Sequence, residues 1–318
     1  MPKSPKRLAN IIFAAHILSA QVLLAEKSLL APDLISQSIF GENEILSGPV
    51  GVAVDDRKIY VADRGNSRIV VFDKNTRQVL KTFGSHGSGE GQFNQMNEVA
   101  VDDRYLYVTD RLNHRIQVFK KIDCSYLLEF GSKGRRPGQF NQPVGIYLDA
   151  SSIYITDHEN HRIQIFDKKT LKVLGIIGVP GNEDGNFFKP TGIVVDKDRI
   201  YVAEWGNNRI QIFDKTSRQF LAKIDNDALP SGEPLKRPHG IAVSQKHIYV
   251  GGVANGCIFI FDKKTLKLAA RIGSLGTNPG QIRQPHGFYI DGNLLYMPEY
   301  SNNRVQVWEI NAGCNLTL

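Results

Sequence analysis

The sequence predicts an all-β protein, a six-bladed β-propeller, and three observations lead to this prediction. One motif of about 14 residues returns six times at intervals of about 47 residues, which indicates a repeat array. Each interval holds four short segments rich in Val, Ile, Tyr and Phe and bounded by turn-forming residues, a composition that favours strands. No segment has a helical period long enough to compete, and four antiparallel strands per repeat are typical of a propeller blade. The copies of the motif begin at Tyr60, Tyr107, Tyr154, Tyr201, Tyr249 and Tyr296.

The third copy shows the four strands that we expect in one blade. They cover residues 143–149, 153–157, 162–167 and 172–178. Gly, Asn, Asp or Pro bounds each segment, and these residues favour turns. The same pattern predicts the strands of the other copies.

The sixth copy lacks a fourth strand, and the beginning of the chain offers a replacement. Strands are expected near 287–290, 294–299 and 304–309, with no further apolar segment after them. The segment ISQSIFG at 35–41 is similar to VLKTFG at 79–84, a fourth strand of an earlier copy. We therefore expect the N-terminal strand to complete the last blade, which closes the ring and removes a free edge.

The first 25 residues have the features of a secretory signal. Lys3, Lys6 and Arg7 precede an apolar run that ends in small residues. Because the run is long, an uncleaved anchor is the alternative, and only then do we expect contact with a membrane. We expect a secreted or periplasmic protein with a signal peptide or anchor at 1–25, a linker at 26–34, the propeller at 35–310 and a tail at 311–318. Loss of the signal lowers the net charge from +7 by three units, and the remaining mild excess does not demand nucleic acid.

An acid and, five residues later, an arginine recur at the turn between the second and third strands. The acids are Asp63, Asp110, Asp157, Glu204 and Glu299, and the arginines are Arg68, Arg115, Arg162, Arg209 and Arg304. In the fifth copy both are absent, and Gly252 and Cys257 take their places. Joint loss favours a charge-assisted pair that closes each hairpin, because a lone half-buried charge is costly. We interpret these residues as structural, and the Asn three residues after each acid as a turn residue in the left-handed conformation or bonded to its own backbone.

The repeated pattern resembles a known family. P-x-G-I-x-V-D followed by I-Y-V-A-D-x-x-N-x-R-I-Q-V-F is similar to the NHL repeat, over residues 35–310 and six times. The resemblance implies the propeller fold. It leaves the function open, because NHL propellers include protein-binding, RNA-binding, sensor and enzymatic members.

Function is expected where the six copies differ. Two positions per blade should face the same end of the ring because strands alternate in direction: the residue after the blade-opening Pro and the residue after the structural acid. Glu98 stands where the other blades have Gly, and basic loop residues add charge at this end. The mixture of basic and aromatic side chains suits an anionic or mixed polar and aromatic ligand. The candidate ligand-binding residues are Arg64, Asn97, Arg111, His158, Thr191, Trp205, His239, His286 and Tyr300.

Two PHG motifs place His239 and His286 at equivalent positions of neighbouring blades. Three interpretations are open: they cap the channel or bond a loop carbonyl, they bind a metal ion, or they act as a general acid/base pair. The sequence also resembles peptidyl-hydroxyglycine amidating lyases, six-bladed propellers with a histidine-ligated zinc near the axis. A catalytic zinc normally takes three protein ligands, but Asn97 and Thr191 stand where a third histidine would.

We therefore expect an exported, monomeric binding module rather than an enzyme. Its partner would be a protein or a small polar or anionic ligand at the loop-rich face, and we assign neither a catalytic residue nor a cofactor. The first alternative is a metal-dependent lyase or hydrolase, with zinc held by His239 and His286. The second is RNA binding through the basic rim, which the signal peptide and the modest charge disfavour.

Overall fold

The computed structural model describes residues 34–42, 44–229 and 234–310. The expected signal at 1–25, the tail at 311–318 and all of the linker except Leu34 lie outside the described residues. Within the described residues, no helix is long and apolar enough to cross a membrane.

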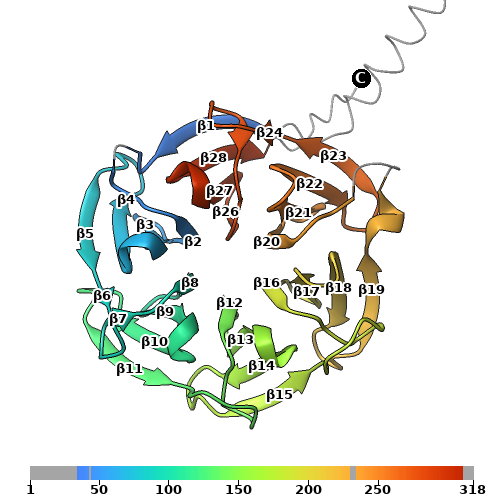
Figure 1. Ribbon diagram of the computed structural model, residues 1–318, viewed down its shortest axis with the longest axis horizontal. Helices are drawn as coiled ribbons and strands as arrows, with labels where there is room; N and C mark the ends of the chain where they lie inside the picture. Colours follow the sequence, from blue (N-terminus) through green and yellow to red (C-terminus); the bar gives the residue numbers. More distant parts are fainter. Residues whose placement is uncertain (1–33, 43, 230–233, 311–318) are drawn as a thin grey trace, which may run out of the picture.

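Six four-stranded antiparallel sheets surround a central axis, as predicted (Figure 1). The first two blades contain β2 (Pro49–Val54), β3 (Lys58–Asp63), β4 (Arg68–Asp73) and β5 (Val79–Phe83), then β8 (Met96–Val101), β9 (Tyr105–Asp110), β10 (Arg115–Lys120) and β11 (Tyr126–Phe130). The next two contain β12 (Pro143–Leu148), β13 (Ser152–Asp157), β14 (Arg162–Asp167) and β15 (Val173–Ile177), then β16 (Pro190–Val195), β17 (Arg199–Glu204), β18 (Arg209–Asp214) and β19 (Phe220–Ile224). The last two contain β20 (Pro238–Val243), β21 (His247–Gly252), β22 (Cys257–Asp262) and β23 (Leu268–Ile272), then β26 (Tyr289–Asp291), β27 (Leu294–Glu299), β28 (Arg304–Ile310) and β1 (Leu34–Phe40).

Short elements occupy the turns and the loops between blades. Four 3-10 turns follow second strands: η1 (Arg64–Asn66), η2 (Arg111–Asn113), η3 (His158–Asn160) and η5 (Tyr300–Asn302). A further turn, η4 (Asn226–Ala228), precedes the fifth blade, and the loops contain the short parallel pairs β6 (Ser85–His86) with β7 (Gln92–Phe93) and β24 (Ser274–Leu275) with β25 (Gln281–Ile282).

The last blade is built from both ends of the described chain. β1 runs antiparallel to β28, with Phe40 opposite Val305 and Ile39 opposite Gln306. The innermost strand, β26, begins at Tyr289 rather than near residue 287 as expected. Pro298 in the facing strand explains this difference, because proline has no N–H to donate to a ladder at that level.

The apolar core lies between the blades. Each of the six buried clusters joins side chains of two adjacent blades; one, for example, packs Ile163 of the third blade against Phe187 and Ile200 of the fourth. Burial of apolar surface is the main source of stability in such a fold. The ring is therefore held together chiefly by contacts between neighbours, and not by each blade alone.

A belt of ion pairs, which the sequence analysis missed, also joins the blades. An aspartate that ends or follows the first strand of a blade pairs with the lysine that follows the third strand of the next blade. The pairs are Asp55 with Lys121 (3.4 Å), Asp102 with Lys168 (3.4 Å), Asp149 with Lys215 (2.9 Å), Asp196 with Lys263 (2.7 Å) and Asp291 with Lys74 (2.7 Å). Ser244 and Ile310 occupy the corresponding positions at the remaining boundary.

The recurrent acid and arginine form the expected structural pairs. Their N–O distances are 2.9 Å for Asp63–Arg68, 2.9 Å for Asp110–Arg115, 2.8 Å for Asp157–Arg162, 2.5 Å for Glu204–Arg209 and 3.0 Å for Glu299–Arg304. Each acid is fully buried and also accepts a backbone N–H from the loop that enters its blade, as Asp157 does from Asn141 at 2.7 Å. The pair therefore fastens the entering loop to the hairpin.

The fifth blade can lack this pair because its entering loop differs. Elsewhere the arginine donates to loop carbonyls, as Arg162 does to Gln139 at 2.9 Å. Before the fifth blade the chain takes another path through η4, and Asn255 makes the contacts instead, donating to Pro234 O at 3.0 Å and accepting from the N–H of Lys236 at 2.9 Å.

The expectation for the recurrent asparagine was wrong in detail. The left-handed residue is the next one, such as His161 after Asn160 (φ 57°). The asparagine side chain donates to the structural acid, as Asn160 does to Asp157 at 2.9 Å, and to a carbonyl of the entering loop, Gly134 O, at 2.8 Å. An amide N–H₂ has two donors, so one side chain can link both groups.

Candidate functional site

The two symmetry-breaking positions of each blade lie at the same end of the ring, as expected. In the third blade, Pro143 at the start of β12 is opposite Asp157 at the end of β13, and the other blades repeat this register. The residues that follow these two therefore surround the axis at one end, which we call the site face.

Three polar side chains form the inner part of the site: Asn97, His239 and His286. The two imidazole centroids are 4.4 Å apart, and the ring of Tyr300 is 5.5 Å from that of His286. Asn97 and His239 are 1% and 7% exposed. The Nδ1 atoms of both histidines and the Nδ2 atom of Asn97 are buried without a hydrogen-bond partner. Buried polar atoms are normally paired, so these three indicate a place for a ligand or for water.

Two arginines complete the cluster. Arg64 donates from Nε to Met96 O at 2.9 Å and from Nη2 to Asn97 Oδ1, and its guanidinium lies 5.6 Å from the centre of the Tyr300 ring. Arg111 donates to Gln142 Oε1 at 2.7 Å, and its Nε is buried without a partner. Neither arginine forms an ion pair with a described carboxylate. Burial, and next the charge of Arg111, lower the pKa of Arg64 to about 10.

Burial and these positive charges keep the histidines neutral. Burial, followed by the charges of Arg64, His158 and Arg111, lowers the pKa of His239 to about 3. The pKa of His286 lies well below its usual value for the same first reason. His158, which lies further from the axis, is also kept neutral. Burial lowers its pKa to about 4, and its Nδ1 is 3.0 Å from Pro190 O.

Two predicted site residues do not share these contacts. The Thr191 hydroxyl is 2.9 Å from Pro238 O and 3.1 Å from Ala203 O, so it links the fourth and fifth blades. Trp205 packs against the rim cations, with its ring centre 4.8 Å from the guanidinium of Arg237 and 5.9 Å from the Lys189 ammonium. The sequence placed both at the correct end but could not show that their side chains were already engaged.

In five of the six blades, the residue that follows the inner position of the site face is a glycine. Together these glycines form a layer across the axis, which we call the glycine layer. A Cβ on Gly192 would lie 2.0 Å from His239 O, and one on Gly240 would lie 1.8 Å from His286 O. Glycine is therefore required where neighbouring first strands approach most closely. Glu98 alone breaks this layer: its carboxyl packs over Gly51 and Gly287, 2.6 to 2.7 Å from where a Cβ on either would stand.

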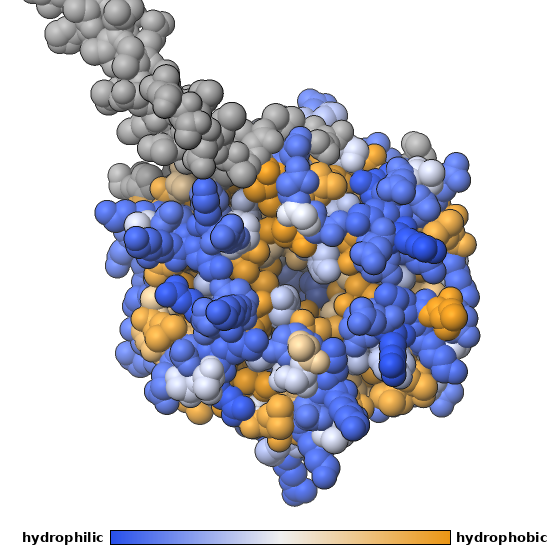
Figure 2. Space-filling model, turned by 180° about the vertical axis from the view of Figure 1, so that it is seen from behind, coloured by the Kyte–Doolittle hydropathy of each residue, from blue (hydrophilic) through white to orange (hydrophobic). Residues whose placement is uncertain are grey.

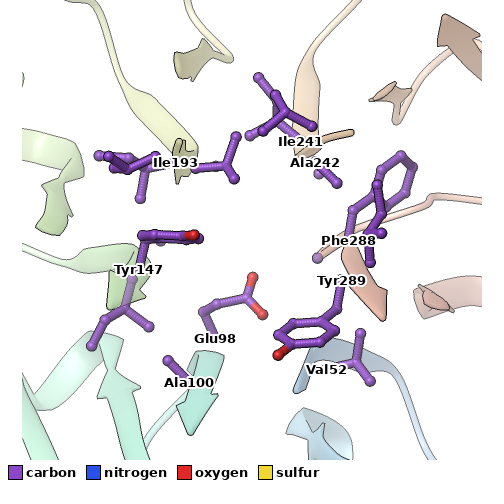
Figure 3. A pocket seen from close by; sticks show the side chains of 18 of the residues that line it. Val52, Glu98, Ala100, Tyr147, Ile193, Ile241, Ala242, Phe288 and Tyr289 are labelled. Carbon is purple, nitrogen blue, oxygen red and sulfur yellow. The ribbon is translucent and has the colours of Figure 1, made fainter. Parts of the chain in front are cut away.

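Beyond the glycine layer the axis widens into a cavity of about 480 Å³, which we call the axial cavity. The later residues of the first strands line it, together with turn residues of the face opposite the site face. The surface is hollowed at the axis (Figure 2), and Glu98, Tyr147 and Tyr289 point into the cavity (Figure 3). Burial raises the pKa of Glu98 to about 8. Hydrogen bonds from the backbone N–H groups of Val52 and Val99 and the charge of Arg64 lower this pKa, but by less than burial raises it. The sequence had marked Glu98 only as a departure from glycine.

The residues of the site face do not fit a catalytic zinc ion. Among the described residues, no group of three or more His, Cys, Asp or Glu side chains is arranged to hold a metal ion. His239 and His286 supply two nitrogens, one fewer than the usual protein ligands of catalytic zinc. Arg64 and Arg111 would repel a dication at the same place.

Comparison with known families agrees with the repeat pattern. A model of the NHL repeat matches residues 46–72, 140–166 and 187–213, in the first, third and fourth blades. The chain is a six-bladed β-propeller in which three blades match the NHL repeat. Among curated proteins, no sequence matches this NHL propeller.

Many solved structures resemble this propeller in fold, and two of them serve as examples. One is a catalytically inactive histidine-to-alanine variant of virginiamycin B lyase from Staphylococcus aureus with quinupristin; the identity is 14%, the TM-score 0.61, and the match covers 88% of this chain and 100% of that chain. The other is the computationally designed Ika8 protein, with 14% identity, a TM-score of 0.51 and coverage of 82% of this chain and 71% of that chain. At this identity the similarity shows the fold and not the activity.

Proposed function

We propose that this NHL propeller is a binding module whose site face takes a small ligand with an anionic group, such as a carboxylate. The observation that supports this most is the pair Arg64 and Arg111, two largely buried guanidinium groups without a carboxylate partner. A buried charge is costly unless it is paired, and a planar anion can satisfy a guanidinium through two hydrogen bonds.

The neighbouring atoms suit the same ligand. The free Nδ2 of Asn97 is a donor, and each neutral imidazole has one donor and one acceptor nitrogen. Tyr300 adds an aromatic wall beside His286. A ligand that combines an anionic group with an apolar or aromatic part therefore fits better than a bare inorganic ion.

Calorimetric titration of the purified protein with small aromatic and aliphatic carboxylates and inorganic phosphate tests the proposal. We expect at least one carboxylate to bind, and Arg111→Gln to weaken it by about tenfold or more, because a charge-assisted hydrogen bond is lost. Arg283→Gln removes an exposed charge from the same face and should leave the affinity nearly unchanged. If no anion binds, or if both variants bind like the wild type, the proposal fails.

A second candidate function is a lyase or hydrolase activity at the same place. Two neutral imidazoles 4.4 Å apart can take up a proton, and the nearby guanidinium groups can stabilise negative charge that develops on a substrate oxygen. The structural neighbour from Staphylococcus aureus is a lyase that is inactive as a histidine-to-alanine variant, which makes this reaction class worth testing here.

Quinupristin is a suitable first probe, with its depletion followed by chromatography for wild type, His239→Gln and His286→Gln. Turnover that either variant abolishes would favour the enzyme over the binding module. A parallel assay with a chelator, and the zinc content by elemental mass spectrometry, separate a metal-dependent form from a metal-free one. Without turnover, the binding module stands as the better proposal.

Export and partners complete the proposal. We propose a secreted or periplasmic monomer, supported by the basic start and apolar run of residues 1–25. A protein that inserts an acidic side chain into the site face is an alternative ligand of the same chemistry. RNA binding at the basic rim would show instead as an affinity that falls steeply with salt.

A further inference from the structure

The axial cavity has a chemistry opposite to that of the site face. Apolar side chains such as Val52, Ile193 and Ile241 form much of its wall, and the carboxyl of Glu98 lies at its inner end (Figure 3). At the mouth, Lys263 is tied to Asp196 at 2.7 Å. The interior therefore presents one acid and no unpaired cation from the residues that line it.

Two tyrosines stand beside this acid. Tyr147 and Tyr289 come from the third and sixth blades, and both rings point into the cavity (Figure 3). Neither hydroxyl has a hydrogen-bond partner among the described residues, and the two rings lie on either side of Glu98 (Figure 3). Two phenol hydroxyls and a carboxyl without a side-chain partner are an arrangement that a ligand could satisfy.

The aspartates that act on the two tyrosines belong to the belt of ion pairs, in which each is paired with a lysine. Burial, Asp291, Tyr147 and Asp55 raise the pKa of Tyr289 to about 12, and burial, Asp149 and Asp196 raise that of Tyr147. Arg64 is the cation that acts on Glu98, from the other side of the glycine layer. A positive group that enters from the opposite face would therefore meet two aromatic rings and a carboxyl at the end.

We propose that the axial cavity is a second ligand site, which binds the amine of a small molecule with an apolar or aromatic body. The ammonium group donates to Glu98, the rings of Tyr147 and Tyr289 flank it, and the body lies along the apolar wall. The cavity volume of about 480 Å³ is within the range of small-molecule sites. This inference does not depend on the anion site, because it uses other residues and the other end of the axis.

The proposal has a definite proton balance. With a pKa of about 8, Glu98 carries a proton at pH 7 while the cavity holds no ligand. An ammonium ion that binds there stabilises the carboxylate, so the proton leaves Glu98 for the buffer and N–H···O⁻ hydrogen bonds form in its place. Binding at pH 7 should thus release nearly one proton per amine.

Calorimetry with three amines, 2-phenylethylamine, hexylamine and cyclohexylmethylamine, in two buffers of different ionisation enthalpy tests this balance. We expect at least one amine to bind with a Kd below about 1 mM, with release of nearly one proton. Glu98→Gln should weaken that amine by about tenfold or more and abolish the proton release. Arg111→Gln, in the other site, should leave amine binding unchanged while it weakens anions.

A second variant and a neutral ligand serve as controls for this experiment. Glu98→Gly restores the residue that the other five blades carry and should fold normally, so it replaces Glu98→Gln if that variant is unstable. 2-Phenylethanol is a neutral match for 2-phenylethylamine, and equal affinity for both would mean that a protonated Glu98 serves neutral ligands, which overturns the proposal. Failure of all three amines to bind overturns it as well, whatever the result at the anion site.

Discussion

At the scale of single residues, the protonation state of the two inner histidines depends on their buried position in the ring. An exposed histidine has a pKa near 6.5, but His239 is 7% exposed and faces Arg64 and Arg111. Both causes favour the neutral ring. The sequence could single out His239 and His286 because they break a repeat, yet their neutrality depends on a burial that only the closed ring provides.

We predict that these histidines make the protein sensitive to acid. In the folded state the pKa of His239 is about 3 and that of His158 about 4, whereas both would be near 6.5 in the unfolded chain. Below pH 6.5 the unfolded state binds more protons, so the free energy of unfolding falls as the pH decreases toward 4. Each such histidine adds up to about 1.4 kcal/mol per pH unit to this slope.

Urea unfolding of wild type and His239→Gln at pH 7, 6 and 5 measures the contribution of one ring. Carboxylates titrate in both proteins, so their effect cancels in the comparison. The variant should lose less stability than the wild type between pH 7 and pH 5. Equal losses in the two proteins would show that His239 is accessible to protons in the folded state.

Other residues show where reasoning from sequence alone ends. The repeat register places Thr191, Trp205 and Glu98 at correct heights along the axis, because that needs only strand alternation. It does not reveal that Thr191 is hydrogen-bonded to Pro238, or that Trp205 packs on Arg237. Such contacts join different blades, so they depend on the curvature of the ring and on side-chain conformations that no repeat encodes.

At the scale of elements, the acid–arginine pair acts as a fastener between a hairpin and the loop that enters it. Asp157 accepts from Asn141, Asn160 and Arg162, and Arg162 in turn donates to carbonyls of the same loop. The sequence predicted the pair because both partners disappear together in the fifth copy. It did not predict the reason, which is the different loop before that blade.

We predict that the cost of losing the arginine depends on its burial. Arg162→Met leaves a fully buried carboxylate without its cation and should lower the free energy of unfolding by about 3 kcal/mol. Arg68→Met should cost clearly less, because the Arg68 side chain is 31% exposed and donates to one carbonyl of the loop before its blade, Ile45 O at 2.6 Å. Arg162 donates to three carbonyls of the corresponding loop. Urea unfolding at pH 7 compares the two; equal costs would contradict the role of the loop contacts.

The glycine layer gives a second prediction for the first strands. Gly192→Ala would bring a Cβ to 2.0 Å from His239 O, so β16 and β20 must separate, at a cost of about 2 kcal/mol or more. Gly89→Ala is the matched control, since the nearest group is the flexible end of the Gln92 side chain at 3.0 Å in an exposed loop. Thermal unfolding should show a large shift for the first substitution and almost none for the second.

At the scale of the whole molecule, the six copies were enough to predict the ring. The number of strands, their order and the closing strand all follow from the period, the four apolar segments and the incomplete last copy. The belt of aspartate–lysine pairs was present in the sequence but unseen, because its partners lie in different copies. Its gap at Ser244 and Ile310 lies between the fifth and sixth blades.

The closing strand allows a test of the ring as one unit. β1 pairs with β28 along its length, and the apolar clusters tie each blade to the next, so an open edge at β28 weakens the sixth blade and its contacts with both neighbours. A chain that begins at residue 42 should unfold at a lower temperature than one that begins at residue 34. It should also aggregate more readily, because β28 becomes an unpaired edge. A synthetic peptide of residues 34–41 added in trans should restore part of the stability by strand addition. A peptide of the same composition in scrambled order should not, and equal rescue by both peptides would argue against closure by this strand.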